Sequence, residues 1–226
     1  GEAPLDLWAV DIRRFSNLHR DRDWVAERTL EAYGKHYTVA FPHEEYTSGR
    51  PRIVSPLYDR LKARGAVFGS KLGWERPNWF APSGTPAVEV PSFARGPAFD
   101  AIGAEHRAVR ERVALIDMSS FSKYEVHGPG ALALLQKLAG NDVDRPVGAI
   151  VYTQLCNERG GIEADVTITR LAEDRFCFVT GSALGVRDRS TIERYIPAGG
   201  GVASDEHTSA RAVRNLCGPR SRDVPA

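Results

Sequence analysis

Tyr152 and Asp165 are the residues of this chain whose types and spacing could do chemistry. Two runs of alternating apolar residues flank residues 157–161, and this pattern predicts a β-hairpin in which Gly160-Gly161 can adopt the positive φ of a tight turn. A carboxylate on such a hairpin can attract a developing positive charge, and can relay a proton if burial raises its pKa. The tyrosine would offer a ring face and a hydroxyl group. The alternative is a half-buried pair in which the acid is solvated.

The elements around this hairpin predict an α+β fold, an antiparallel sheet with packed helices, because strands and helices do not alternate regularly. The arms that carry Tyr152 and Asp165 should form an antiparallel meander with a third strand at 176–180. Asp23 is expected to cap the first helix, and Ser55 followed by Pro56 to begin the second. The other expected strands are 124–127 and 212–216, and the expected helices are 24–33, 55–65, 102–115, 131–138 and 183–195.

Four blocks of the sequence resemble, in the same order, the folate-binding domain of the glycine-cleavage T-protein (aminomethyltransferase) family. They are residues 116–131, 141–142, 152–165 and 216–222, and the third reads Tyr-Thr-x-x-x-Asn-Glu-x-Gly-Gly-Ile-x-x-Asp. Upstream, residues 55–58, 65–69 and 73–80 resemble the linker region of dimethylglycine and sarcosine dehydrogenases, in which an FAD-dependent amine-oxidising half precedes a folate-binding half. The resemblance implies an aminomethyltransferase folate-binding-like domain, preceded by a small part of a flavoprotein domain.

The same resemblance implies roles for individual residues. Asp165 matches the acid beside the pterin of tetrahydrofolate, near the nitrogens that capture a one-carbon unit, and is the expected catalytic residue. Tyr152 matches a tyrosine that lines the same pocket, while Phe121 and Thr167 match positions near the folate by spacing alone. Ala164 departs from a family pattern in which two acids can be adjacent, and Asp165 is the acid retained.

The segment 73–97 carries five of the fourteen prolines and is the expected domain boundary. Residues 1–97 are predicted to be the C-terminal part of an FAD-dependent oxidoreductase domain with its linker, and residues 98–226 the N-terminal half of the folate-binding domain. Glu75 and Arg76 are expected to form a local ion pair, with Trp74, Trp79 and Phe80 buried at the inter-domain contact; binding of a methylated amine is the alternative there.

The composition of the chain limits the classes of partner that it could bind. The net charge of +1, with arginines scattered among acids, argues against nucleic acid, and no apolar run approaches the roughly 18 residues of a membrane span, which predicts a soluble protein. Three isolated cysteines predict reduced, buried thiols, and the histidines and cysteines lack metal-ligand spacing, so no metal site is expected. The excess of arginine over lysine is compatible with a GC-rich bacterial source and a cytoplasmic location, or the mitochondrial matrix in a eukaryote.

Together these observations predict a fragment of an FAD-dependent dimethylglycine or sarcosine dehydrogenase-like enzyme, with an N-methyl amine and tetrahydrofolate as small-molecule ligands. No G-x-G-x-x-G follows a predicted strand, so FAD would be bound by a flavoprotein half outside this chain. The second half of the folate-binding domain is also expected to be missing, and the isolated fragment to be inactive. Two alternatives remain, a standalone aminomethyltransferase of the glycine-cleavage type and a non-catalytic interaction scaffold with a folate-domain-like fold.

Overall fold

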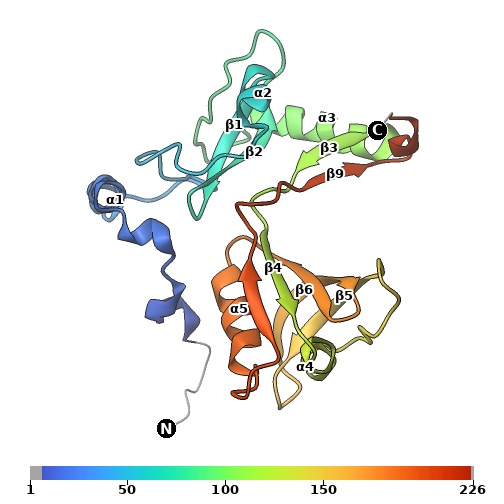
Figure 1. The fold of residues 1–226 in the computed structure, drawn as a ribbon. Coiled ribbons are helices and arrows are strands. Elements are labelled where there is room, and N and C mark those ends of the chain that lie inside the picture. Colours follow the sequence, from blue (N-terminus) through green and yellow to red (C-terminus); the bar gives the residue numbers. More distant parts are fainter. Residues whose placement is uncertain (1–6, 225–226) are drawn as a thin grey trace. The chain divides into compact units, whose positions relative to one another are not determined.

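The computed structural model describes residues 7–224, apart from the side chains of Ala9 and Arg13, and divides them into two compact units (Figure 1). The first unit consists of residues 7–16 and 121–211, and the second of residues 17–120 and 212–224. Each unit therefore combines segments that are distant in the sequence. The predicted division into sequence domains at 1–97 and 98–226 stays a prediction.

The first unit is built on a five-stranded antiparallel sheet with the strand order β5-β6-β7-β4-β8. The expected meander is confirmed, because β5, β6 and β7 are consecutive neighbours in this order. The α+β fold class with an antiparallel sheet is confirmed as well. The strands are β4 (Ser122–His127), β5 (Ile150–Cys156), β6 (Ile162–Ala172), β7 (Arg175–Thr180) and β8 (Ala203–Glu206).

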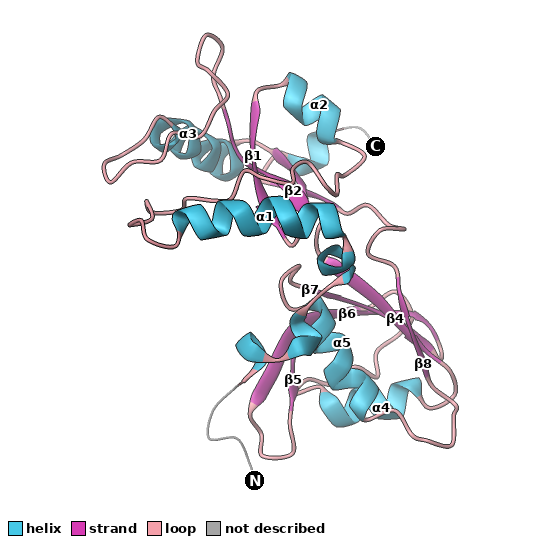
Figure 2. Ribbon diagram, turned by 90° about the vertical axis from the view of Figure 1, so that its left-hand side faces the viewer, coloured by secondary structure: helices cyan, strands magenta, loops and turns pink. Residues whose placement is uncertain are grey.

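Two helices, α4 (Ala131–Leu138) and α5 (Gly185–Arg194), pack on the same face of this sheet (Figure 2). Helix α4 has the predicted bounds, and α5 lies within the predicted 183–195. The 3₁₀ helices η1 (Trp8–Val10) and η2 (Ile12–Arg14) also belong to this unit. The apolar core between sheet and helices consists of Tyr124, Val126, Ala131, Leu134, Leu135, Leu138, Val143, Leu155, Ala164, Val166, Ile168, Phe176, Phe178 and Ile192.

The second unit contains two separate two-stranded antiparallel sheets and three α-helices. One sheet is the hairpin of β1 (Ala66–Lys71) and β2 (Trp74–Phe80), and the other pairs β3 (Ala114–Asp117) with β9 (Arg214–Cys217). Its buried apolar cluster is small, with Val67 and Trp79 packed against Ala101. The helices are α1 (Arg22–Lys35), α2 (Tyr58–Ala63) and α3 (Ala98–Glu111), with 3₁₀ helices η3 (Asn17–Arg20) and η4 (Ser221–Asp223).

Three predictions about helix ends were wrong. Asp21, not Asp23, caps α1 by accepting a hydrogen bond from the Trp24 amide at 3.0 Å. Helix α2 begins at Tyr58, because the Ser55 hydroxyl is used by Asp117 and by the Leu57 amide instead of capping a helix. Helix α3 ends at Glu111, and the rest of the predicted 102–115 helix enters β3, which pairs with a strand about a hundred residues later.

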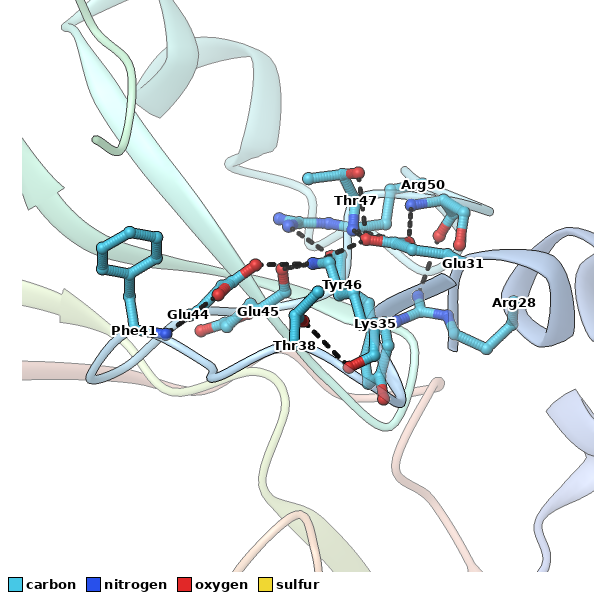
Figure 3. Close-up of polar contacts among 11 residues, drawn as sticks. Arg28, Glu31, Lys35, Thr38, Phe41, Glu44, Glu45, Tyr46, Thr47 and Arg50 are labelled. Atoms are coloured by element: carbon cyan, nitrogen blue, oxygen red, sulfur yellow. Dashed lines mark hydrogen bonds and ion pairs between the residues drawn. The ribbon is translucent and has the colours of Figure 1, made fainter. Parts of the chain in front are cut away.

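Helix α1 is held by polar contacts, and none of its described residues is buried (Figure 3). The Glu31 carboxylate accepts hydrogen bonds from the backbone amides of Thr47 and Ser48 at 2.9 and 2.7 Å. Lys35 links Glu31 to Glu44, with N–O distances of 2.9 and 3.0 Å. Burial raises the pKa of Glu31, but the hydrogen bonds from residues 47 and 48 and from Lys35 lower it by more.

Glu75 is buried in β2, and its ion-pair partner is Arg50 rather than Arg76, so the predicted local pair was wrong. The Arg50 guanidinium donates to both Glu75 oxygens, at 2.9 and 2.7 Å, and to the Phe68 carbonyl at 2.8 Å. Neighbouring residues on a strand point to opposite faces, which explains why Arg76 cannot take this place. The three cysteines form no disulfide and are half-buried instead of buried.

Candidate functional site

The hairpin of β5 and β6 places three of the four predicted site residues, Tyr152, Asp165 and Thr167, on one face of the sheet. Tyr152 lies directly opposite Thr167, and Gln154 lies directly opposite Asp165. The turn follows the sequence prediction in part, since Gly160 has a φ of +78° while Gly161 does not have a positive φ. The Asn157 side chain accepts a hydrogen bond from the Gly161 amide at 2.9 Å and so closes the turn.

The Tyr152 hydroxyl donates a hydrogen bond to the Asp165 carboxylate, with an O–O distance of 2.8 Å. Both side chains are exposed, and 60% of Tyr152 is accessible. This hydrogen bond raises the pKa of Tyr152, so the phenol remains a donor near neutral pH. Within the described part of the chain, Tyr152 is the one hydrogen-bond partner of the Asp165 carboxylate. The arrangement presents a negative charge and an aromatic ring side by side to a ligand.

The structure brings three of the four predicted residues together. Thr167 is half-buried on the same face of β6 as Asp165, because residues two apart on a strand share a face. Phe121 directly precedes β4, which is two strands away from β6 in the sheet order. Gln154 was not among the predicted residues, although the hairpin register would have identified it as the cross-strand neighbour of Asp165.

The other end of the same sheet face is closed by a segment that follows β8. Lys123 and Glu125 point away from the helices, yet both are buried. The His207 amide donates to the Lys123 carbonyl at 2.8 Å, and Arg211 reaches Glu125 at 3.1 Å. Burial raises the pKa of Glu125, but hydrogen bonds from Arg175 and Arg211 lower it by more. The accessible part of the face is therefore the β5–β6 part that carries Tyr152 and Asp165.

The turn between β4 and α4 is the place where a phosphate group of a dinucleotide could bind, if the turn had room for it. Its Gly128-Pro129-Gly130 sequence leads from a strand into a helix. A Cβ atom built on Gly128 would clash with the Gly201 carbonyl oxygen, and one on Gly130 would lie 2.9 Å from Val202. Atoms of Gly201 and Val202 thus pack closely against both glycines, so this turn does not offer the open backbone that a dinucleotide phosphate needs.

Other parts of the described structure have fewer features of a ligand-binding site than the β5–β6 face. A mainly apolar pocket of about 390 Å³ lies in the second unit, lined by residues of β2, α3 and β3 that include Phe80, Val109 and Leu115. No group of three or more His, Cys, Asp or Glu side chains within residues 7–224 could hold a metal ion. No helix in the same range is long and apolar enough to cross a membrane.

Comparison with known proteins gives two family matches. Residues 57–226 match the GCVT N-terminal domain, and residues 1–55 match the FAD dependent oxidoreductase central domain. Among solved structures, the glycine cleavage system aminomethyltransferase T from Bartonella henselae is similar with a TM-score of 0.61 and 26% identity, over 76% of this chain and 42% of that chain. This likeness agrees with the expected folate-domain-like fold.

Several curated proteins are similar in sequence. A 4-methylaminobutanoate oxidase (formaldehyde-forming) of Paenarthrobacter nicotinovorans is 39% identical, over 99% of this chain and 27% of its own length. The mitochondrial pyruvate dehydrogenase phosphatase regulatory subunit of Mus musculus is 35% identical, over 97% and 26%. The mitochondrial sarcosine dehydrogenase of Homo sapiens is 38% identical, over 76% and 22%.

This chain thus spans about a quarter of the length of the curated relatives that it matches. The expected resemblance to sarcosine dehydrogenase-like proteins, with a T-protein-like domain, is confirmed. From the match over residues 57–226, the chain belongs to the GCVT N-terminal domain family.

Proposed function

We propose that this chain is the folate-binding part of an FAD-dependent oxidoreductase that demethylates an N-methyl amino acid or a related methylated amine. The observation that carries the proposal is the exposed Tyr152–Asp165 pair on the helix-free face of the sheet, in a segment of the GCVT N-terminal domain family. The names of two relatives, an oxidase of a methylamino acid and a sarcosine dehydrogenase, support the substrate class.

The residues on this face fit a flat heterocycle that carries hydrogen-bonding groups. The exposed ring of Tyr152 offers a stacking surface, and the Asp165 carboxylate can draw a positive charge toward its edge. Thr167, opposite Tyr152, adds a hydroxyl group to the same surface, and Phe121 would border it only from a more distant strand. Tetrahydrofolate, when bound, would supply the nitrogen atoms that accept a one-carbon unit.

The proposed site is open on this chain. Asp165 and Tyr152 are exposed, so neither side chain is shielded from water, which weakens any electrostatic attraction. The closely packed turn at Gly128 offers no phosphate site, and we expect the residues that hold FAD to belong to a flavoprotein half outside this chain. We therefore expect weak folate binding and no measurable demethylation by the chain alone.

A second candidate function is supported by one comparison. The pyruvate dehydrogenase phosphatase regulatory subunit matches 97% of this chain, and its name describes a regulatory subunit. A protein of this class could keep the fold as a scaffold for a partner. The third alternative, a standalone aminomethyltransferase, is supported by the structural match to aminomethyltransferase T, which covers 76% of this chain.

Calorimetric titration of tetrahydrofolate into the chain, at native sequence and as Asp165→Asn, tests the proposal. Asp165→Asn keeps the shape of the side chain and removes its charge, so we expect the affinity to fall by about tenfold, equal to about 1.4 kcal/mol. Asp174→Asn, which removes the charge of another exposed acid of the same sheet unit, is the matched control and should bind normally. Equal heats for native protein and Asp165→Asn would remove the support for a folate site and favour the scaffold.

A further inference from the structure

A cavity of about 360 Å³ lies in the second unit, apart from the apolar pocket described above. Both aromatic and charged side chains line it, and a cavity of this size suits a small organic molecule. Its whole lining comes from residues 18–73, so the cavity lies within one compact unit. The lining residues with the most bearing on a ligand are Trp24, Arg28, Glu44, Glu45 and Tyr46.

Arg28, on α1, is a cation of this cavity without an acid partner. Within residues 7–224 it forms no ion pair, and its guanidinium makes one hydrogen bond, from Nη2 to the Ser48 carbonyl at 2.8 Å. Nε is buried without an acceptor, and Nη1, which is not buried, makes no hydrogen bond either. A guanidinium carries five N–H donors, and a half-buried cation with unmade hydrogen bonds is costly. Arg28 can therefore accommodate a further acceptor, which the described chain does not supply.

Two aromatic rings hold the Arg28 guanidinium in place. Its Cζ atom lies 4.8 Å from the centroid of the Tyr46 ring and 5.3 Å from that of the Trp24 ring. Cation–π contacts of this kind orient a guanidinium without neutralising its charge. The Nη1 donors are thus presented from a fixed position, which lowers the entropy cost of binding an acceptor.

Glu45 is the negative charge of the same cavity that lacks a cation. Its carboxylate accepts hydrogen bonds from the Ser70 amide and, at 3.4 Å, from the Asn78 side chain, and it forms no ion pair with any described residue. Glu44, the other acid of the cavity, differs because the Lys35 ammonium lies 3.0 Å from its carboxylate (Figure 3). Glu45 can therefore still attract a positive charge.

The other cations near the cavity are engaged elsewhere. Lys35 is shared by Glu44 and Glu31, and Arg50, which acts on Glu45 from a longer distance, donates to both Glu75 oxygens. One unpaired positive and one unpaired negative side chain thus line the cavity, without forming an ion pair with each other. A molecule that carries both charges can satisfy both side chains, whereas an anion would be repelled by the acids and a cation by Arg28.

We propose that this cavity binds a small zwitterion of the amino-acid class, whose carboxylate accepts hydrogen bonds from Arg28 Nη1 and whose ammonium group faces Glu45. The carboxylate suits Arg28 because a hydrogen bond between two charged groups is stronger than one between neutral groups. The site lies in a different unit from the Tyr152–Asp165 pair, and the inference does not rest on the proposed function.

The test is a titration of sarcosine into the ¹⁵N-labelled chain, followed by NMR at the Arg28 Nε–H and Trp24 indole N–H signals. Sarcosine is a zwitterionic N-methyl amino acid, and acetate and methylammonium carry its two charges separately. We expect both signals to shift and to saturate with sarcosine, and acetate and methylammonium each to bind about tenfold more weakly or less. A response to acetate as strong as that to sarcosine would overturn the proposal, as would the absence of a saturable shift.

Variants locate the two charges, with the Trp24 indole as the signal and circular dichroism as the check on folding. Arg28→Gln and Glu45→Gln should each weaken sarcosine binding by about tenfold. Arg22→Gln, which removes an exposed positive charge from the same helix, is the matched control and should bind normally. Equal affinities for the native protein and Glu45→Gln would contradict the zwitterion even if Arg28→Gln failed to fold. The titration contains no folate, so its outcome and that of the folate calorimetry can fail separately.

Discussion

Among the described residues, fourteen buried apolar side chains form the core of the first unit, whereas the corresponding cluster of the second unit has three. The first unit also buries the carboxylate of Glu125, but the second unit has few apolar contacts beside its polar ones, which are the buried ion pair of Glu75 with Arg50 and the hydrogen bonds of Glu31 that hold α1. A sheet that is covered by two helices can be stabilised mainly by apolar burial. Small hairpins and a helix without buried residues depend on directed polar contacts, which are sensitive to charge.

This comparison bears on where a ligand can bind. In the first unit, the apolar core fixes the strands of one face, and the opposite face is free to carry exposed polar residues such as Tyr152 and Asp165. In the second unit, the carboxylates Glu31 and Glu75 are already used to hold the chain together. The first unit is thus the better scaffold for a site, because its site residues can change without loss of the fold.

Removing a core side chain of the first unit should have the largest effect. Phe178→Ala deletes a ring that is 1% exposed, and we expect the free energy of unfolding to fall by about 4 kcal/mol. Ile150→Ala, on β5 of the same sheet but 68% exposed, should change it by less than about 0.5 kcal/mol. Urea unfolding followed by circular dichroism measures both; similar values for the two variants would contradict the apolar account of this unit.

Breaking the buried ion pair should have the next largest effect, confined to the second unit. Glu75→Gln leaves the Arg50 guanidinium without its charge partner, and we expect a loss of about 3 kcal/mol. The matched control is Arg76→Gln, the adjacent residue of β2, which makes no such pair. Tryptophan fluorescence during urea unfolding reports mainly on the second unit, which contains Trp24, Trp74 and Trp79, three of the four tryptophans. Equal midpoints for Glu75→Gln and the native protein would rule out a stabilising role for the pair.

The smallest effect is expected at Glu31, and it should depend on pH. Glu31→Gln weakens the hydrogen bonds to residues 47 and 48, with a loss of about 1–2 kcal/mol at pH 7. The folded-state pKa of Glu31 is lowered, so this contribution is present above the unfolded value of about 4.5 and is lost as the pH falls below it.

The stability difference between native protein and Glu31→Gln should therefore shrink between pH 6 and pH 3. Thermal unfolding over this range measures it, with Glu111→Gln at the exposed end of α3 as the control that shows no such trend. A difference that stays constant with pH would mean that the Glu31 carboxylate does not hold the segment that follows α1.

The parts of the fold that were predicted correctly are those whose sequence signals lie within or next to the element itself. Helix 131–138 follows a Gly-Pro-Gly turn, and the β5–β6 hairpin follows from alternation around Gly160. The β3 strand was missed, because its partner β9 is about a hundred residues away and an apolar run next to a helix reads as more helix. The partner of Glu75 was missed for the same reason, since Arg50 comes from a distant segment.

The candidate site was predictable to a similar extent. Tyr152 and Asp165 were predicted near each other by the hairpin pattern, and in the structure a hydrogen bond joins their side chains. Phe121 does not join this pair, because it precedes β4, which lies two strands from β6. The order of strands in a sheet is a property of the tertiary structure, and spacing along the sequence does not reveal it.

The central claim is that the open face of β5 and β6 is the ligand-binding surface, and locating tetrahydrofolate on the molecule by NMR tests it most directly. We predict amide shift changes at residues 152, 165 and 167, and a nuclear Overhauser contact between the pterin and the Tyr152 ring. The buried Tyr124 ring, on the opposite face, should show none and serves as the internal control. Shift changes confined to the pocket around Phe80 and Leu115 in the second unit would contradict the account.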